Sequence, residues 1–354
     1  MTRGVFTKPS AWVVVAMIAA SLVGVGTATA QGDARYDLPV PATRVMGLQY
    51  ADLPGNAGTV DLYLPADQRK PAPVIVWSAG SGFMGDNGNS RGERIAAALS
   101  HRGYAVAAVA VRSSSQAIFP AQVNDAKAAV RWLRAHADEY NLDPDRFASM
   151  GNSSGGWVAS MLATTGNDPA LEGAVGLTGP SSAVQAGVSF FAPTDFLQQD
   201  AYMLPGGCDI INRMGGGTDC HDDATSPESR LLGAPIQEVP GLAKLADPGS
   251  WADAETPPML LTHGTDDLLL PTHQGQAFFE ALSAARAEAT FYTVHGFGHD
   301  MSFLDQANHH ALTDVLTTSG NAKVRTAEPE PVTWDTVADF LDAALNRGTP
   351  PGKR

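Results

Sequence analysis

The sequence has 354 residues, with 23 lysines and arginines against 37 aspartates and glutamates, a formal charge of −14 at pH 7. This balance disfavours binding to nucleic acid or to an anionic membrane surface, which calls for clustered Lys and Arg. Hydrophobic residues make up 44% of the chain and charged residues 17%, so the chain is not disordered in bulk. Two cysteines are too few for a disulfide-framework mini-protein or a cysteine-rich zinc module.

The first thirty residues have the pattern of an export signal. Two basic residues precede the apolar run Ala11–Val25, and Ala28-Thr29-Ala30 supplies the small residues that a signal peptidase accepts. The alternative is a membrane anchor, but the run is shorter than the roughly 20 residues that a spanning helix needs. We predict a signal peptide over 1–30, cleavage before Gln31, and a mature chain, 31–354, exported to the periplasm or the cell exterior without a membrane segment.

Beyond the signal, strand-like and helix-like patterns alternate along the chain. The predicted strands are Val45–Tyr50, Thr59–Leu64, Val74–Trp77, Tyr104–Val111, Arg146–Met150, Val184–Phe191, Met259–Thr262 and Thr290–Val294. The predicted helices are Arg91–His101, Gln122–Tyr140, Trp157–Ala163, Gln274–Ala287 and Trp334–Leu345. Strands separated by helices of this length predict an α/β fold with a mostly parallel central sheet and helices on both faces.

Two stretches interrupt this alternation. Residues 196–257 are rich in Gly, Pro and Asp and are too many for a plain crossover, so we expect an inserted lid. Residues 308–331 are weakly patterned and are expected to form a second insertion.

Two cysteines, Cys208 and Cys220, lie within the predicted lid and enclose a Gly-rich stretch. In an oxidising compartment, two cysteines that close a short flexible loop are expected to be bridged. The alternative is a metal site that also recruits His221, Asp222 and Asp223, but the sequence has no second Cys pair at ligand spacing.

One strand-to-helix turn has the pattern of a nucleophile site. The strand Arg146–Met150 runs into Gly151-Asn152-Ser153-Ser154-Gly155, and a helix-forming segment follows. The Gly-x-Ser-x-Gly pattern fits the nucleophile elbow, in which a tight turn presents a serine at the tip of the sheet. The glycines are needed because side chains there would collide with the strand and helix on either side. We predict Ser153 as the nucleophile; the alternative is a structural glycine turn.

A serine hydroxyl needs a general base, and the loop after the strand Thr290–Val294 offers two histidines. His299 follows a Gly-Phe-Gly segment that can bend back over the sheet, whereas His295 sits close to the strand end. We predict His299 as the base, with His295 as the alternative.

The orienting carboxylate is expected between the serine and the histidine in the chain. The strand Met259–Thr262 runs into Asp266 and Asp267, of which one would point towards the imidazole and the other towards solvent. Asp195 follows another strand and is a third candidate. We favour Asp267.

These segments resemble the α/β-hydrolase esterases related to the bifunctional feruloyl and acetyl-xylan esterases, the BD-FAE-like family. The resembling segments are Val74–Asp86, Phe119–Ala163, Val184–Phe196, Ser226–Gln237 and His263–His299, with the most specific matches at 119–132 (FPAQVNDAKAAVRW) and 226–233 (SPESRLLG). The resemblance implies an α/β-hydrolase fold with Ser153 as nucleophile, Asp267 as acid and His299 as base. That mechanism needs no metal or organic cofactor.

One segment departs from the family pattern, in which His-Gly-Gly-Gly and an aromatic residue follow the third strand. Here the segment is Ala79-Gly80-Ser81-Gly82-Phe83. Oxyanion holes are built from backbone amides, so losing the His and one Gly need not remove a donor. By this matching, the amides of Ser81, Gly82 and Ser154 are expected to face the tetrahedral oxygen; the alternative is a Gly-rich turn without a catalytic role.

The sequence therefore predicts a secreted serine carboxylesterase that hydrolyses small-molecule or polysaccharide esters, such as acetyl or feruloyl esters. A serine peptidase of related fold is the first alternative; such enzymes usually carry a large extra domain or an amine-anchoring acidic pair, and neither is evident. A non-catalytic binding protein of the same fold is the second, and the full set of triad residues argues against it.

Overall fold

The computed structural model describes residues 43–166, 168–305, 310–320 and 323–346. The predicted signal peptide, 1–30, lies outside the described residues. Among the described helices, none combines the length and the apolar character required to cross a membrane.

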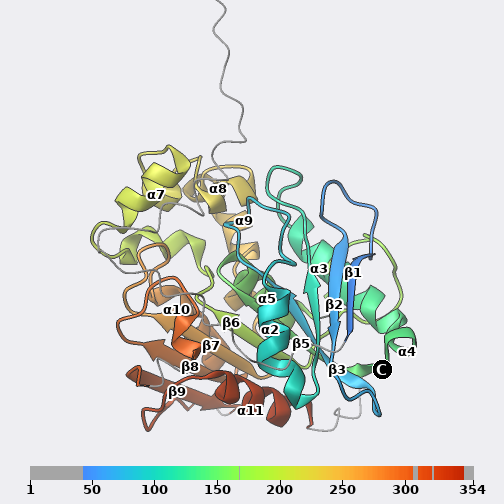
Figure 1. Ribbon diagram of the computed structural model, residues 1–354. Coiled ribbons are helices and arrows are strands. Elements are labelled where there is room, and N and C mark those ends of the chain that lie inside the picture. The colour runs from blue at the N-terminus through green and yellow to red at the C-terminus, as the bar shows by residue number, and fades with distance from the viewer. Residues whose placement is uncertain (1–42, 167, 306–309, 321–322, 347–354) are drawn as a thin grey trace, which may run out of the picture. The chain divides into compact units, whose positions relative to one another are not determined.

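Within the described residues, one sheet contains ten strands in the order β1-β2-β4-β3-β5-β6-β7-β8-β9-β10 (Figure 1). Their bounds are β1 Thr43–Gln49, β2 Thr59–Leu64, β3 Ala72–Ser78, β4 Ala105–Val109, β5 Leu142–Asn152, β6 Ala186–Phe190, β7 Met259–Gly264, β8 Glu288–Val294, β9 Thr313–Ser319 and β10 Arg325–Ala327. The strands from β4 to β8 run parallel, and β1, β2, β9 and β10 add antiparallel edges. The mostly parallel sheet predicted from the sequence is confirmed.

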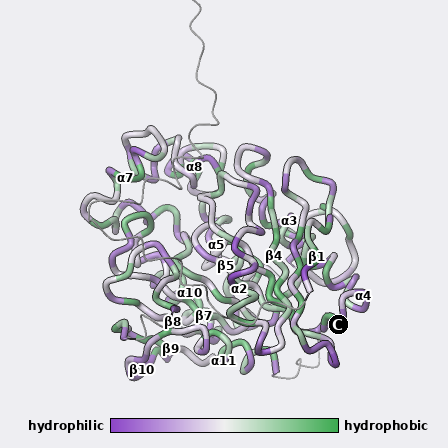
Figure 2. Tube along the Cα trace, in the orientation of Figure 1, coloured by the Kyte–Doolittle hydropathy of each residue, from purple (hydrophilic) through white to green (hydrophobic). Residues whose placement is uncertain are grey.

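Helices cover both faces of this sheet. Successive side chains of a strand point to opposite faces, so each central strand contributes to two hydrophobic cores. In β3, Val74 and Val76 join the core under α3 (Ala121–Ala135), α5 (Ser154–Thr165) and α10 (His273–Ala284). Ile75 and Trp77 join the core under α2 (Gly92–Leu99) and α11 (Trp334–Leu345). Hydrophobic residues accordingly concentrate along the central strands in Figure 2, and hydrophilic residues on the outer loops.

The predicted helix Gln122–Tyr140 is two helices, α3 and α4 (Ala137–Tyr140), separated at His136. The His136 ring stacks on Trp132, and its Nδ1 lies 2.8 Å from the Trp132 carbonyl oxygen. The apolar stripe continues across this junction into Ala137, so periodicity alone did not reveal the break.

The described part of the weakly patterned stretch 308–331 extends the sheet. Residues of this stretch form β9 and β10, which extend the sheet beyond β8 as antiparallel strands. β9 pairs with both β8 and β10, and β10 is the edge strand. Antiparallel strands commonly have one solvated face, so they lack the continuous apolar run of a buried parallel strand. In β9 buried and exposed positions mix along TDVLTTS, which explains the weak sequence signal.

Residues 196–257 fold mainly into short helices. These are α7 (Gly207–Gly215), α8 (Pro227–Leu232) and α9 (Pro240–Leu245), with 3₁₀ helices at Phe196–Gln198, Asp200–Tyr202, Cys220–Asp222, Ile236–Glu238 and Pro248–Trp251. Cys208 and Cys220 form the predicted disulfide, although a helix, α7, occupies much of the expected flexible loop. Ile236 and Ala246 are buried in the α3–α5 core, so part of the segment is integral to the fold.

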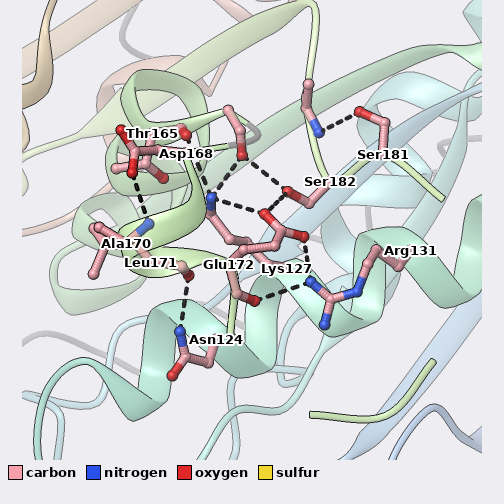
Figure 3. A network of polar contacts seen from close by, with 12 residues as sticks. Asn124, Lys127, Arg131, Thr165, Asp168, Ala170, Leu171, Glu172, Ser181 and Ser182 are labelled. Carbon is pink, nitrogen blue, oxygen red and sulfur yellow. Dashed lines mark hydrogen bonds and ion pairs between the residues drawn. The ribbon is translucent and has the colours of Figure 1, made fainter. Parts of the chain in front are cut away.

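A cluster of charged side chains contacts the connection between α5 and β6. This connection includes α6 (Pro169–Glu172). Figure 3 shows Lys127 and Arg131 of α3 reaching the Glu172 carboxylate. Lys127 Nζ also donates to the Gly166 carbonyl at 2.6 Å, and Arg131 donates to the carbonyls of Val175 and Leu177 at 2.8 and 2.7 Å. We call Lys127, Arg131 and Glu172 the α3 clamp.

Candidate active site

Ser153 occupies a strained turn between β5 and α5, with φ 54° and ψ −132°. A positive φ is uncommon for a residue with a side chain and persists only where the surroundings enforce it. A Cβ on Gly151 would lie 2.1 Å from the Gly155 carbonyl oxygen, and a Cβ on Gly155 would lie 2.0 Å from the Ser78 carbonyl oxygen. The two glycines of the motif are therefore required by backbone approach, as the sequence pattern predicted.

Three side chains from three separate loops meet at the carboxyl ends of the parallel strands. Ser153 Oγ lies 2.9 Å from His299 Nε2, and His299 Nδ1 lies 2.7 Å from Asp267 Oδ2. In this arrangement Nδ1–H donates to the carboxylate, and Nε2 accepts from the serine hydroxyl. Asp267 is fully buried, and the Phe191 ring packs against His299 with centroids 4.6 Å apart. The geometry allows His299 to take the serine proton while Asp267 balances the charge.

Four donors converge on the Asp267 carboxylate. Oδ1 accepts the amides of Leu269 and Leu270 at 2.8 and 3.0 Å, and Oδ2 accepts from His299 and His263, the latter at 3.2 Å. Burial alone raises the pKa of Asp267, but the charge of His299 and the hydrogen bonds from both histidines lower that pKa well below its usual range. The carboxylate therefore stays ionised at every pH at which a histidine base would be neutral.

His263 is a further hydrogen-bond partner of Asp267, which the sequence reasoning missed. It ends β7, is fully buried, and shares its Nε2–H between Asp267 Oδ2 and the Leu270 carbonyl oxygen at 3.1 Å. The available signal was its place at a strand end, four residues before Asp267. That spacing crosses a turn, so it does not determine where the imidazole points.

The alternative base and acids have other surroundings. His295 is exposed and lies 2.9 Å from Asp314 through Nε2, and Asp266 accepts from the Thr265 hydroxyl at 2.9 Å. Across the described ranges, neither these two side chains nor that of Asp195 hydrogen-bonds to the serine or the histidine of the three-residue contact. The structure therefore brings together Ser153 and the favoured pair.

The loop after β3 is attached to the serine turn by two side chains that flank Ser153. The Gly80 amide donates to Asn152 Oδ1 at 3.1 Å, and the Ser81 amide donates to Ser154 Oγ at 2.8 Å. A Cβ on Gly80 would lie 2.5 Å from Ser153 Cβ, so only glycine fits there without displacement. The sequence reasoning did not assign these attachments, because they connect residues more than seventy positions apart.

The three amides expected around the oxyanion differ in availability. The Ser81 amide is engaged by the Ser154 hydroxyl. The amides of Gly82 and Ser154 have no hydrogen-bond acceptor in the part of the chain that the structure describes. Ser154 is the first residue of α5, and the amides of a first helical turn are free to bind an anion.

The residues that could form a metal site are already used in protein contacts. Ligand atoms of Asp200, Cys220 and His221 lie within 4.8 Å of one another, but Cys220 Sγ belongs to the disulfide. Both nitrogens of His221 have protein partners, and Asp200 accepts the backbone amides of His221 and Asp222 at 3.0 and 3.1 Å. Asp223 accepts the amides of Thr218 and Thr225. The donors that remain do not suit a transition-metal ion.

Comparison with known proteins gives consistent similarities. The family model BD-FAE matches residues 60–282. The probable carboxylic ester hydrolase LipM of Mycobacterium tuberculosis is 27% identical over 265 residues, which cover 73% of this chain and 57% of LipM. This chain thus spans little more than half the length of that relative.

Two solved structures are similar along most of the chain. One is a truncated carbohydrate esterase from gut microbiota, 26% identical, with a TM-score of 0.71 and coverage of 87% of this chain and 98% of that one. The other is a bifunctional GH43-CE protein of Bacteroides eggerthii, 28% identical, with a TM-score of 0.69 and coverage of 86% of this chain and 35% of that one.

Proposed function

Since the chain belongs to the BD-FAE family and has the α/β-hydrolase fold, we propose that it is a serine carboxylesterase that acts through an acyl-enzyme on Ser153. The observation that carries the proposal is the continuous contact from Ser153 Oγ to His299, at 2.9 Å, and from His299 to the buried Asp267, at 2.7 Å. In this proposal Ser153 is the nucleophile and His299 is the general base. Asp267 is the carboxylate that orients the imidazole and stabilises its charged form.

The proposed reaction has two halves. His299 Nε2 accepts the proton of Ser153 as Oγ attacks the ester carbonyl, and the alcohol leaves with that proton when the tetrahedral intermediate collapses. A water molecule then gives its proton to His299 and attacks the acyl-enzyme, which releases the carboxylic acid and restores Ser153. The ionised Asp267 stabilises the imidazolium in both halves.

For the oxyanion we propose the amides of Gly82 and Ser154 as the donors. Both are without an acceptor among the described residues, whereas the Ser81 amide already donates to Ser154 Oγ. In this assignment the hydrogen bond of the Ser81 amide holds the loop that carries Gly82 in place. Two preorganised amides stabilise the developing charge without reorganising when the reaction occurs.

For the substrate we propose a carbohydrate that bears short acyl esters such as acetyl. The support is that two structures similar to this chain are named a carbohydrate esterase and a GH43-CE protein. We further propose that residues 196–257 act as the lid that selects the alcohol part. A Cβ on Gly82 would lie 3.6 Å from Pro227, so α8 borders the proposed oxyanion loop.

We also propose that the protein is exported. The signal-like pattern of residues 1–30 and the Cys208–Cys220 disulfide support this, because disulfides persist in oxidising compartments and are rare in the cytosol. Sequencing the amino terminus of protein secreted by its native host tests the proposal. A mature chain that begins at Gln31 is the expected result, and an intact Met1 terminus would contradict it.

A fluorophosphonate probe and a substrate panel test the proposed activity. The probe should add one phosphonyl group per chain, mapped by mass spectrometry to Ser153, and heat-unfolded protein should stay unlabelled. Folded protein that does not react would overturn the assignment. On the panel we expect p-nitrophenyl acetate and acetylated xylan to be hydrolysed faster than methyl ferulate and long-chain nitrophenyl esters. The opposite ranking would contradict the proposed acyl group and leave the esterase assignment unchanged.

A further inference from the structure

His221 is buried in the 196–257 segment, between a carboxylate and the loop that carries Asp267. Its Nδ1 lies 2.9 Å from Glu228 Oε2 and its Nε2 lies 3.0 Å from the Leu269 carbonyl oxygen. His221 is 1% exposed and Glu228 is 3% exposed. A carboxylate and a carbonyl can both only accept, so the two hydrogen bonds require a proton on each ring nitrogen. His221 and Glu228 therefore form a buried ion pair with a third partner on another loop.

The third partner, Leu269, also contacts the carboxylate of the proposed triad. Its amide donates to Asp267 Oδ1 at 2.8 Å, while its carbonyl accepts from His221. The peptide groups on the two sides of Leu269 are therefore fixed from opposite directions. A shift of the Leu269 carbonyl would rotate the amides that hold Oδ1 and would change the aim of Oδ2 at His299.

We propose that His221 is a positioning residue for Asp267, acting through the Leu269 carbonyl. The inference rests on the proposed function, in which Asp267 is the acid of the triad. It assigns to the 196–257 segment a part in catalysis besides covering the site.

Stability alone does not account for this ion pair. A buried ion pair is on balance no more stabilising than apolar residues of the same volume, because desolvation offsets the attraction between the charges. A directional hydrogen bond to a catalytic loop is a property that apolar residues cannot supply. The hydrogen bond from the His221–Glu228 pair to the Leu269 carbonyl is therefore the feature that distinguishes His221 from an apolar core side chain.

Several contacts fix His221 in turn. Cys220, the preceding residue, is bridged to Cys208 in α7, and the His221 amide donates to Asp200 Oδ1 at 3.0 Å. Gln199 donates to the other oxygen of Glu228 at 3.4 Å. The charged groups that face the His221 ring or backbone are thus Glu228 and Asp200.

Two substitutions of His221 separate its two hydrogen bonds. In His221→Gln the side-chain amide nitrogen reaches the neighbourhood of Nε2 and can still donate to Leu269. In His221→Asn it reaches the neighbourhood of Nδ1 and can donate only to Glu228. We expect His221→Asn to lose about tenfold to a hundredfold in kcat, since small misplacements of a catalytic group have effects of this size. We expect His221→Gln to recover most of that loss, with KM nearly equal in the two variants.

A role confined to satisfying Glu228 predicts the reverse order, with the Asn variant the more active. The same pair in the Asp267→Asn background gives the second readout. If His221 acts through Asp267, the two variants should differ there by less than about twofold in kcat. His136→Asn, which alters a partly buried histidine at the distant α3–α4 junction, is the matched control and should leave kcat unchanged.

The outcomes distinguish the inference from the function on which it rests. Equal kcat for the Asn and Gln variants, together with severe loss in Asp267→Asn, would overturn the positioning role and leave the triad standing. Near-wild-type kcat in Asp267→Asn would overturn the triad assignment itself. If both His221 variants fail to fold, Glu228→Gln tests the same inference. In this variant the glutamine side chain can donate to His221 Nδ1, and His221 Nε2–H can still donate to the Leu269 carbonyl. Its kcat should stay within about threefold of wild type, and a loss as large as tenfold would overturn the inference.

Discussion

The connection before β6 and the connection after it both depend on buried charges, and they lie at opposite ends of that strand. Before β6, the α3 clamp binds carbonyl groups of the loop that follows α5. After β6, the His221–Glu228 pair binds the Leu269 carbonyl of the loop that contains Asp267. In α/β sheets the loops at the carboxyl ends of the strands carry the chemistry. We therefore infer that similar buried charges stabilise the fold in one connection and position the proposed site in the other.

The difference shows what buried charge can report about function. The carbonyls bound by the α3 clamp belong to Thr165, the last residue of α5, and to the connection 166–177. Among the described hydrogen bonds, none of these residues contacts Ser153 or His299. The carbonyl bound by His221 belongs to Leu269, whose amide donates to the carboxylate of Asp267, the proposed acid of the triad.

The largest effect is expected for Ser153, the proposed nucleophile. Ser153→Ala removes the attacking oxygen and should lower kcat for p-nitrophenyl acetate by at least about a thousandfold while the protein folds normally. His295→Ala is the matched loop control, because this exposed histidine pairs with Asp314 instead. Initial rates and circular dichroism spectra check both, and near-wild-type turnover of Ser153→Ala would refute the mechanism.

The second largest effect is expected for Asp267, the proposed triad carboxylate. Asp267→Asn should lower kcat by at least about a hundredfold, because an amide disturbs the imidazole tautomer and cannot balance its charge. Asp266→Asn, one residue away and exposed, should change kcat by less than about twofold. Steady-state kinetics on the two purified variants decide the matter, and equal small losses would point to Asp195.

The His221–Glu228 pair should stabilise its connection only within a pH window. Burial alone lowers the pKa of His221, but the charge and hydrogen bond of Glu228 raise it above the ordinary value of 6.5; burial raises the pKa of Glu228, but His221 lowers it below 4.5. The His221 contribution is complete below pH 6.5 and is lost as the pH rises through the raised pKa. The Glu228 contribution is complete above pH 4.5 and is lost as the pH falls through the lowered pKa.

Amide exchange in residues 220–232 should therefore be slowest between pH 4.5 and 6.5, after correction for the intrinsic exchange rate. In Glu228→Gln the alkaline loss of protection should begin at a lower pH, because the main group that raises the His221 pKa is gone. Identical corrected profiles for the variant and the wild type would show that the pair does not control this connection.

The disulfide should have a smaller effect on turnover. Removing it with Cys208→Ala/Cys220→Ala frees a loop whose closure is worth about 3 kcal/mol in the chain-entropy model. Because neither hydrophobic core of the described residues includes a residue of α7, we expect faster proteolysis between Leu204 and Ser226 and a severalfold shift in KM, with little change in melting temperature. A thiol count on protein purified from its native host and denatured without reductant checks the bridge. Two free thiols would exclude it.

The smallest effect on turnover is expected at the α3 clamp. Arg131→Met removes four contacts to the connection before β6 and should lower the free energy of unfolding by about 3 kcal/mol, as when a buried ion pair loses one partner. The kcat of the folded variant should stay within about twofold of wild type. A loss of kcat comparable to that of His221→Asn would erase the contrast between the two connections.

The sequence predicts the features that follow from local order along the chain. Ser153 lies in a glycine-bounded turn between a strand and a helix, and Asp267 and His299 follow the two strands expected to end at the same edge. The disulfide follows from two cysteines in one short stretch and a predicted signal. Spacing and strand direction led to Ser153, His299 and the neighbouring Asp266 and Asp267. The family resemblance strengthened the choice of Asp267, and the disulfide inference rested on the predicted export.

The features that sequence reasoning missed depend on packing between distant segments. Asn152 and Ser154 reach a loop more than seventy residues earlier, and His221 reaches Leu269 across 48 positions. Polar residues in such places have no periodic pattern of their own. The antiparallel strands β9 and β10 were missed because exposed polar positions interrupt their apolar pattern, as is common where one face of a strand meets solvent.

Gly80, next to the proposed nucleophile, limits how this site can diversify. A Cβ there would meet Ser153 and the Asn152 carbonyl, so this part of the site is closed to side chains. Pro227 of the 196–257 segment lies 3.6 Å from a Cβ placed on Gly82, so that segment borders the same loop with side chains instead of backbone. Laboratory evolution of substrate range should therefore accumulate its substitutions in that segment, and libraries that randomise Gly80 should return glycine.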